Sequence, residues 1–268
     1  MIKRTLYFGN PAYLSTENRQ LVIRLPDKCG SGNAVTKSIP IEDIGVVVLD
    51  NRQITITQAA LESLSENASA VIVCDSTHHP VSLQLPLDGN TLQSERFAAQ
   101  IRASLPLKKQ LWQQTIQCKI RNQAMVLSSI RNCETGNMIA WSSQVKSGDS
   151  DNLEARAAAY YWRNMFPSVP DFTRDRYGCQ PNNLLNYGYA ILRAVVARAL
   201  VVNGLLPTLG IHHHNRYNAY CLADDIMEPY RPFVDALVVD IFDNSDGFVD
   251  LTTSVLSLIH ISEPTRPY

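Results

Sequence analysis

The sequence predicts an α+β fold in which a small β-rich N-terminal domain precedes a larger, all-helical domain. Three observations support this class. Residues 1–86 contain short β-branched and aromatic runs separated by turns, whereas residues 92–250 have the apolar spacing of helices. Between them, residues 87–91 combine Asp, Gly and Asn, which is typical of a linker. A chain of 268 residues is also long enough to bury a sizeable core.

The N-terminal domain is predicted to consist of strands interrupted by one helix. Thr57 is a suitable N-cap for that helix, which ends near residue 66, because residues 60, 61 and 64 have helical spacing. The predicted strands cover residues 5–8, 21–25, 37–41, 44–49, 70–74 and 81–85.

The C-terminal domain is predicted to be helical throughout. The predicted helices cover residues 95–103, 107–129, 151–166, 183–202 and 223–242. Asp151 or Asn152 is the expected cap of the third helix, and Pro167 is its stop signal.

Composition is that of an ordinary globular chain, with 45% hydrophobic and 18% charged residues. The longest apolar runs, such as residues 194–202, are interrupted by Arg198 and are too short to span a bilayer, so we expect no membrane association. The N-terminus lacks the apolar core of a secretory signal. The cysteines are scattered without a Cys-x-x-Cys pair, which argues against a zinc ribbon or disulfide scaffold and favours reduced thiols in a cytoplasm.

Charge is distributed unevenly although the formal net charge is only −1. Residues 91–200 carry 14 Lys and Arg against 7 Asp and Glu, whereas residues 201–250 carry 2 against 8. A basic middle beside an acidic segment fits a polyanion-binding surface next to a metal-binding pocket. The alternative is that the basic residues simply solvate helix faces.

Residues 210–232 combine three adjacent histidines with a group of acids. Asp225 and Glu228 are three residues apart, so on a helix they project from the same face and repel each other unless a cation lies between them. A histidine from the preceding loop completes a nitrogen and oxygen ligand set that suits a divalent metal. The alternative is a surface histidine loop followed by acids that cap a helix.

A further ligand is expected from another element, and Glu154 is the candidate. It lies in the first turn of its predicted helix and is followed by alanines that allow another helix to approach closely. Such an approach would bring Glu154 near Asp225 and Glu228. The alternative is that Glu154 only complements the helix dipole.

Three motifs in order resemble a known family: Asn-Leu-Glu-Ala-x-Ala-Ala-x-Tyr-Tyr from residue 152, the segment 182–193, and Gly-Ile-His-His followed by Ala-Asp-Asp-Ile-Met-Glu-Pro-Tyr-Arg-Pro. They are similar to those of the catalytic subunit of the CRISPR spacer-acquisition complex, the first CRISPR-associated protein. The short motif forms are most similar to the branch linked to type II systems. The resemblance extends to about residue 250, and the tail, residues 251–268, is atypical. We therefore expect a C-terminus that is truncated or altered.

The resemblance implies a metal-dependent catalytic role for the helical domain. Glu154, His213 and Glu228 match the family's ligands, and Asp225 is either a further ligand or an accompanying acid. Asp224 is expected to be a cap or to hydrogen-bond a ligand. The implied cofactor is Mg²⁺ or Mn²⁺. The implied reaction is attack of a DNA 3′-hydroxyl on a phosphodiester, with hydrolysis when water replaces the hydroxyl.

Several other residues are candidates for contact with double-stranded DNA, the implied substrate. Arginines would bind backbone phosphates, and tyrosines would stack near duplex ends. Surface charge and core packing are the respective alternatives. The candidates are Arg163, Arg174, Arg176, Arg216, Tyr187 and Tyr189.

The resemblance also implies an assembly. A homodimer would form through the strand-rich domain, and two dimers would flank a dimer of the small second CRISPR-associated protein in a heterohexamer. Two other functions stay open from the residues alone. One is a metal-dependent nuclease or phosphodiesterase without an integration role, and the other is a non-catalytic DNA-binding scaffold.

Overall fold

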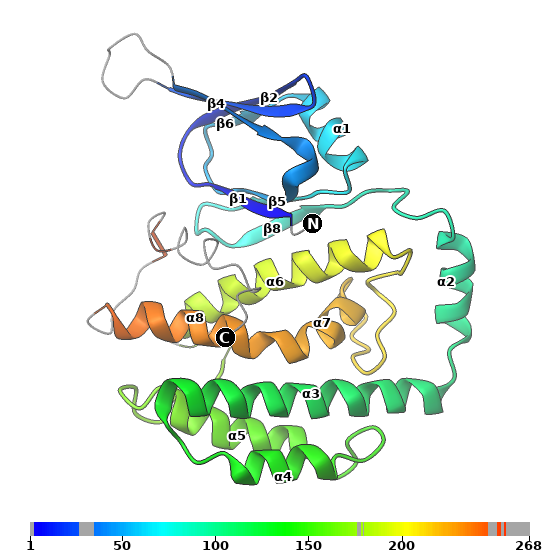
Figure 1. Ribbon diagram of the computed structural model, residues 1–268, viewed down its shortest axis with the longest axis vertical. Coiled ribbons are helices and arrows are strands. Elements are labelled where there is room, and N and C mark those ends of the chain that lie inside the picture. The colour runs from blue at the N-terminus through cyan, green and yellow to red at the C-terminus, as the bar shows by residue number, and fades with distance from the viewer. Residues whose placement is uncertain are drawn as a thin grey trace.

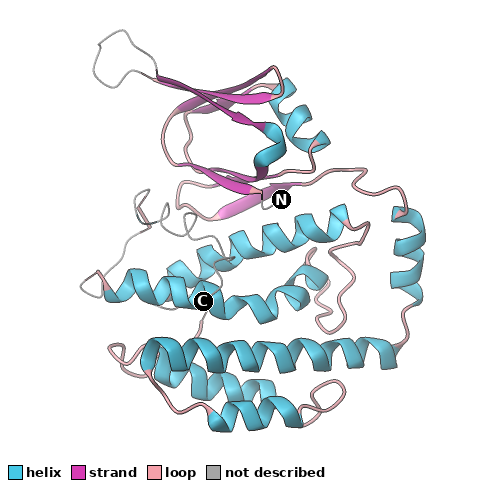
Figure 2. Cartoon of the chain, in the orientation of Figure 1, coloured by secondary structure: helices cyan, strands magenta, loops and turns pink. Residues whose placement is uncertain are grey.

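The predicted α+β class is confirmed by a computed structural model, which describes residues 3–26, 35–175, 178, 180–245, 251–252 and 255. In this part of the chain the strands all lie in the N-terminal part and the long helices in the C-terminal part (Figure 2). Most of the tail, residues 251–268, lies outside the described residues.

The N-terminal part contains two four-stranded sheets (Figure 1). The first has the order β1 (Arg4–Phe8), β5 (Ile44–Leu49), β7 (Ala70–Cys74) and β8 (Pro80–Gln84). Its first three strands are parallel and β8 is antiparallel. The second has the order β4 (Val35–Pro40), β3 (Gln20–Leu25), β2 (Ala12–Glu17) and β6 (Ile54–Ile56). A short 3-10 turn, η1 (Ile41–Asp43), leads into β5.

The first sheet is buried on both faces, which explains the continuous apolar run of β5. Successive side chains of a strand point to opposite faces. Val47 and Leu49 therefore enter the core between the two sheets, whereas Val46 and Val48 enter the core of the helical part. Ile44 joins Val47 and Leu49 although alternation alone would not place it there, because the pairing with β1 shifts register between Ile44 and Val46. Helix α1 (Gln58–Glu66) packs on β2, and the Thr57 hydroxyl accepts a hydrogen bond from the Ala60 amide, as the predicted cap requires.

Helix α3 (Leu105–Arg131) runs through the middle of the helical part. In Figure 1 it lies between α7 (Cys221–Met227) with α8 (Arg231–Asp243) and the pair α4 (Gly136–Gln144) with α5 (Leu153–Met165). It packs against all four of these helices. The remaining helices are α2 (Gln93–Arg102), which precedes α3, and α6 (Asn182–Val202).

Helix α6 joins the two parts of the fold because it packs on β7 and β8 as well as on α7 and α8. Among the described residues it is the one helix that is long and apolar enough to cross a bilayer by length and composition. In this protein 56% of its most apolar window is buried inside the fold. Its hydrophobicity therefore matches its place in the core.

The single helix expected over residues 223–242 is wrong, because the structure divides it into α7, the 3-10 turn η2 (Glu228–Tyr230) and α8. Pro229 has no amide hydrogen to continue the α-helical ladder, and Pro232 repeats the effect at the start of α8. The elements β2, β6 and α4 were not predicted, since they are short and strongly polar or weakly periodic.

A buried carboxyl group, Asp235 of α8, links three helices of this core. It accepts hydrogen bonds from the hydroxyls of Tyr161 in α5 and Tyr189 in α6. Burial raises its pKa to about 7, and this effect outweighs the hydrogen bonds and the charges of two nearby arginines, which act in the opposite direction. The folded protein thus holds this proton more tightly than the unfolded chain does.

Replacing Asp235 by asparagine is expected to change how stability depends on pH. Because the folded pKa is raised, the wild-type free energy of unfolding falls as pH rises from about 4 to about 7. Between pH 5 and 8 the wild-type protein should lose about 3 kcal/mol relative to Asp235→Asn. Urea unfolding of both proteins across this range measures the difference, and parallel pH curves would contradict the prediction.

Candidate active site

The candidate site is centred on a lysine of α3 that contacts two glutamates from different elements. Lys119 Nζ lies 2.5 Å from Glu154 Oε1 and 2.7 Å from Glu228 Oε2. The lysine side chain is only 11% exposed. Burial alone would lower the pKa of Lys119, but the charges of Glu228 and Glu154 outweigh it and raise this pKa. The ammonium group is therefore a stable cation between two carboxylates.

Glu154 is placed by the start of α5. Asn152 occupies the N-cap position, as predicted, but its side chain makes no capping bond. Asp149 does this instead: its Oδ1 accepts from the Leu153 amide at 2.9 Å and its Oδ2 from the Glu154 amide at 3.0 Å. The predicted proximity of Glu154 to Glu228 is found, because both carboxylates contact one Lys119 nitrogen. The helix that packs closely on α5 is α3, which carries this lysine.

Glu228 is placed by the break between α7 and α8. The turn that contains it is held on α3 by Asn122, whose Nδ2 donates to the Pro229 carbonyl at 2.7 Å. Glu228 is 3% exposed, and its Oε1 lies 3.1 Å from an Arg231 nitrogen. Its Oε2 is buried and accepts no hydrogen bond, because the nearby Lys119 nitrogen does not have hydrogen-bond geometry. One oxygen of Glu228 therefore has a cation at contact distance but accepts no hydrogen bond.

His213 is oriented by Asp225. The Asp225 carboxylate accepts from the amides of Ile211 and His212 through Oδ2, at 2.7 and 2.9 Å, and from the His213 amide through Oδ1 at 3.2 Å. His213 Nδ1 lies 2.5 Å from the same Oδ1. Since a carboxylate only accepts, Nδ1 carries the proton and Nε2 keeps a lone pair for a metal.

The pKa values of this pair follow from the contact. The hydrogen bond to Asp225 raises the pKa of His213, against the effect of burial. Burial alone would raise the pKa of Asp225, but the hydrogen bonds from His213 and the loop amides lower it. Asp225 is fully buried, and its hydrogen bonds hold residues 210–216, the histidine loop. In this conformation it supports His213, and a role as a further ligand stays a prediction.

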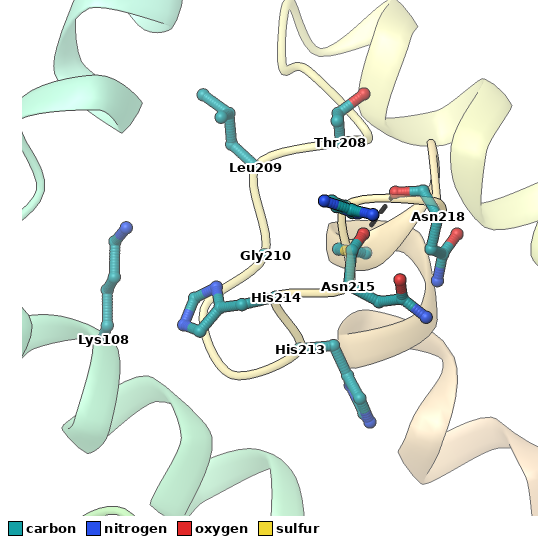
Figure 3. Close-up of a pocket in the computed structure, with 10 residues that line it drawn as sticks. Lys108, Thr208, Leu209, Gly210, His213, His214, Asn215 and Asn218 are labelled. Atoms are coloured by element: carbon teal, nitrogen blue, oxygen red, sulfur yellow. Dashed lines mark hydrogen bonds between the residues drawn. The ribbon is translucent and has the colours of Figure 1, made fainter.

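The histidine loop also rests on α3. The His212 ring stacks on Trp112 with centroids 4.0 Å apart, and His213 meets the same indole edge-on at 5.7 Å. The loop also lines a recess of about 260 Å³, whose wall includes Lys108 of α3. Figure 3 shows that the rings of His213 and His214 project in different directions from this loop. The loop thus presents its histidines to different surroundings.

Asp224 is occupied elsewhere. Its two oxygens lie 2.6 and 3.1 Å from guanidinium nitrogens of Arg193 in α6, and Asn218 donates to it at 2.7 Å. It therefore ties α7 to α6, and these partners are neither the helix-end amides of the expected cap nor a proposed metal ligand.

The donor set suits a hard or borderline divalent cation, although the ligands are not assembled around one in this conformation. Among the described residues, no three His, Cys, Asp or Glu side chains are close enough together to hold an ion. Lys119 occupies the space between the two glutamates. The buried oxygen of Glu228, which accepts no hydrogen bond, and the Nε2 atom of His213, whose ring is oriented by Asp225, nevertheless fit the ligand chemistry of Mg²⁺ or Mn²⁺.

The candidate DNA contacts differ in their surroundings. Arg163 of α5 and Arg216 of the histidine loop are exposed, and contact with phosphate stays a prediction for both. Arg174 donates to the side chains of Asn182 at 3.0 Å and Asn186 at 2.6 Å, so its guanidinium is engaged within the fold. Arg176 lies outside the described residues.

The two candidate tyrosines are core residues. Tyr187 is fully buried and Tyr189 is 8% exposed. The Tyr189 ring lies beneath the guanidinium groups of Arg174 and Arg231, at 5.1 and 4.9 Å. Neither ring can stack on a base in this conformation, so the core-packing alternative describes their place.

Lys119 and Trp112 are the residues of the site that the sequence prediction missed. A signal for Lys119 was present, because it lies on the buried stripe of α3 defined by Trp112, Ile116, Ile120 and Gln123. A lysine in such a stripe requires an acidic partner from another element.

Comparison with known proteins identifies the family. The family model described as "CRISPR associated protein Cas1" matches residues 6–248. The CRISPR-associated endonuclease Cas1 of Neisseria meningitidis serogroup C (strain 8013) is 38% identical over 95% of this chain and 81% of its own length. A Cas1 endonuclease of Pyrobaculum aerophilum is 26% identical over 83% of this chain and 79% of its own length.

Solved structures share the fold. A casposase bound to its integration product matches 97% of this chain and 80% of its own, with a TM-score of 0.75 and 21% identity. The Cas1 protein of Thermotoga maritima matches 96% of this chain and 87% of its own, with a TM-score of 0.71 and 17% identity. The chain therefore belongs to the Cas1 family, the CRISPR-associated endonucleases that bind DNA and integrate spacers.

Proposed function

We propose that Glu154, His213 and Glu228 hold one Mg²⁺ or Mn²⁺ ion and form the centre at which a DNA 3′-hydroxyl attacks a phosphodiester of the repeat. The main support for the proposal is one buried oxygen of Glu228. This oxygen accepts no hydrogen bond and lies beside the Lys119 ammonium, which also contacts Glu154. A bound ion would supply Lewis acidity for the phosphate and for the attacking oxygen.

The protein's own residues prepare this centre. Asp225 fixes the proton of His213 on Nδ1 and thereby directs Nε2 away from the loop. Arg231 holds the second oxygen of Glu228 and limits its rotation. The stack of His212 on Trp112 holds the loop on α3. Together these contacts reduce the movement needed when ligands close around an ion.

The assembly is part of the proposal. We propose a homodimer formed through the strand-rich part and a heterohexamer with the small Cas2-type partner on a DNA duplex, in the cytoplasm of an organism with a type II-like system. Structurally similar proteins support this assembly, since they include a Cas1–DNA complex and a Cas6-RT-Cas1–Cas2 complex. Arg163 and Arg216 would add phosphate contacts without reading sequence.

Integration is tested with the partner protein, a short duplex with 3′-hydroxyl ends and a supercoiled plasmid that carries the repeat. The expected result is a joined product that requires Mg²⁺ or Mn²⁺ and is lost when the duplex ends in 3′-deoxynucleotides. Cleavage of branched DNA in the absence of any joined product would favour the alternative of a nuclease without an integration role. Joining that persists after exhaustive chelation would overturn the metal-dependent mechanism.

A further inference from the structure

We propose that Lys119 is a built-in counter-ion that holds Glu154 and Glu228 together, and that a divalent cation must displace its ammonium group to bind. The inference rests on the proposed metal site and concerns what holds its two glutamates together before a metal binds. It assigns Lys119 a positioning role and a direct influence on metal affinity.

The geometry places the ammonium group where a shared ligand would be. Glu154 comes from α5 and Glu228 from the turn after α7, and both elements pack on α3. Lys119 Nζ is in contact with one oxygen of each glutamate, at 2.5 and 2.7 Å. No other basic side chain contacts both glutamates within the described part of the chain. Lys119 is therefore the link that joins them.

Burial makes this link necessary. The side chain of Glu228 is 3% exposed and that of Glu154 is 26% exposed. Water therefore screens the repulsion between the two carboxylates poorly. Arg231 lies at the other oxygen of Glu228 and, among the described residues, forms no ion pair with Glu154. Removing the Lys119 charge would leave two neighbouring carboxylates without a shared cation, and they would repel each other.

The same contacts make Lys119 a competitor of the metal. The Glu228 oxygen beside Lys119 is the buried atom without a hydrogen bond, which is the atom that a metal would use. Two cations cannot share that position, because their mutual repulsion is large at such a distance in a poorly screened site. Metal binding therefore includes the free energy of moving the ammonium away from both glutamates.

The test compares Lys119→Met with Lys109→Met, which removes an exposed lysine from the same helix. Mn²⁺ binding is measured by calorimetry, and the thermal midpoint is measured with and without Mn²⁺. Without metal, Lys119→Met is expected to unfold roughly 5–15 °C below wild type. Lys119→Met should bind Mn²⁺ at least about tenfold more tightly than wild type does. Adding Mn²⁺ should restore most of the decrease in its thermal midpoint. Lys109→Met should match wild type in both measurements.

The other possible outcomes separate the counter-ion role of Lys119 from the existence of the metal site. Mn²⁺ affinity that is unchanged or weaker in Lys119→Met would overturn the inference while leaving the metal site intact. Absence of Mn²⁺ binding by the wild-type protein would overturn the proposed metal site itself. If Lys119→Met is insoluble without metal, it is refolded from urea with and without Mn²⁺. Recovery only with Mn²⁺ supports the counter-ion role, and failure in both buffers contradicts it.

Discussion

Replacing Glu228 by glutamine is expected to lower the rate of strand transfer by about 10³-fold or more while the fold is retained. Glutamine has the shape of glutamate but lacks the charge that a divalent cation needs from this buried oxygen. Mn²⁺ binding should weaken in the same variant. Single-turnover joining with saturating DNA, together with Mn²⁺ titration, measures both effects.

Asp224→Asn is the matched control for this substitution. Asp224 is similarly buried and lies in the adjoining helix, but its partner is Arg193. We expect it to lower stability by about 1–3 kcal/mol through that lost pairing, with Mn²⁺ affinity close to wild type. An Asp224→Asn protein that loses metal binding as strongly as Glu228→Gln would show that the effect is one of general destabilisation.

Asp225→Asn is expected to weaken Mn²⁺ binding by about 10- to 100-fold through His213. The asparagine amide has one acceptor oxygen, whereas Asp225 uses both of its oxygens as acceptors. If the amide nitrogen faces His213, it donates to Nδ1 and forces the imidazole proton onto Nε2, which then cannot bind a metal. If it faces the loop, it meets the donor amides of Ile211 and His212.

The two variants are distinguished by the state of His213. In Asp225→Asn with the amide nitrogen facing His213, NMR of the ring nitrogens should show the proton on Nε2, whereas Glu228→Gln should keep the wild-type tautomer. Replacing Asp225 by alanine should cost more stability, since three backbone amides lose their acceptor at about 1–3 kcal/mol each if they stay buried. An Asp225→Asn protein with wild-type metal affinity would contradict the positioning role.

The fold was largely predictable because its elements have strong local signals. The apolar run of β5 and the capped start of α1 both lie where the sequence predicts them. The break at Pro229 was missed because the apolar spacing continues on both sides of it, from α7 into α8. A proline inside such a pattern indicates a break in the helix, because it lacks the amide hydrogen that the helix needs.

The acids of the site were predictable in identity but not in arrangement. The resemblance of the motifs to the family singles out Glu154, His213 and Glu228, yet it contains no information about helix α3, which contributes the lysine between the two glutamates. Lys119 belongs to a different element, and its contacts depend on how α5 and η2 pack on α3. The part played by Asp225 likewise depends on loop amides, whose direction a sequence does not specify.

The most direct test of the metal site is a crystal structure with Mn²⁺, with the ion located by its anomalous scattering. We expect a single peak within about 2.0–2.3 Å of His213 Nε2 and of one oxygen each from Glu154 and Glu228, with the Lys119 ammonium moved away from both glutamates. A peak elsewhere, or Lys119 still bridging the two glutamates in the metal-bound protein, would contradict it.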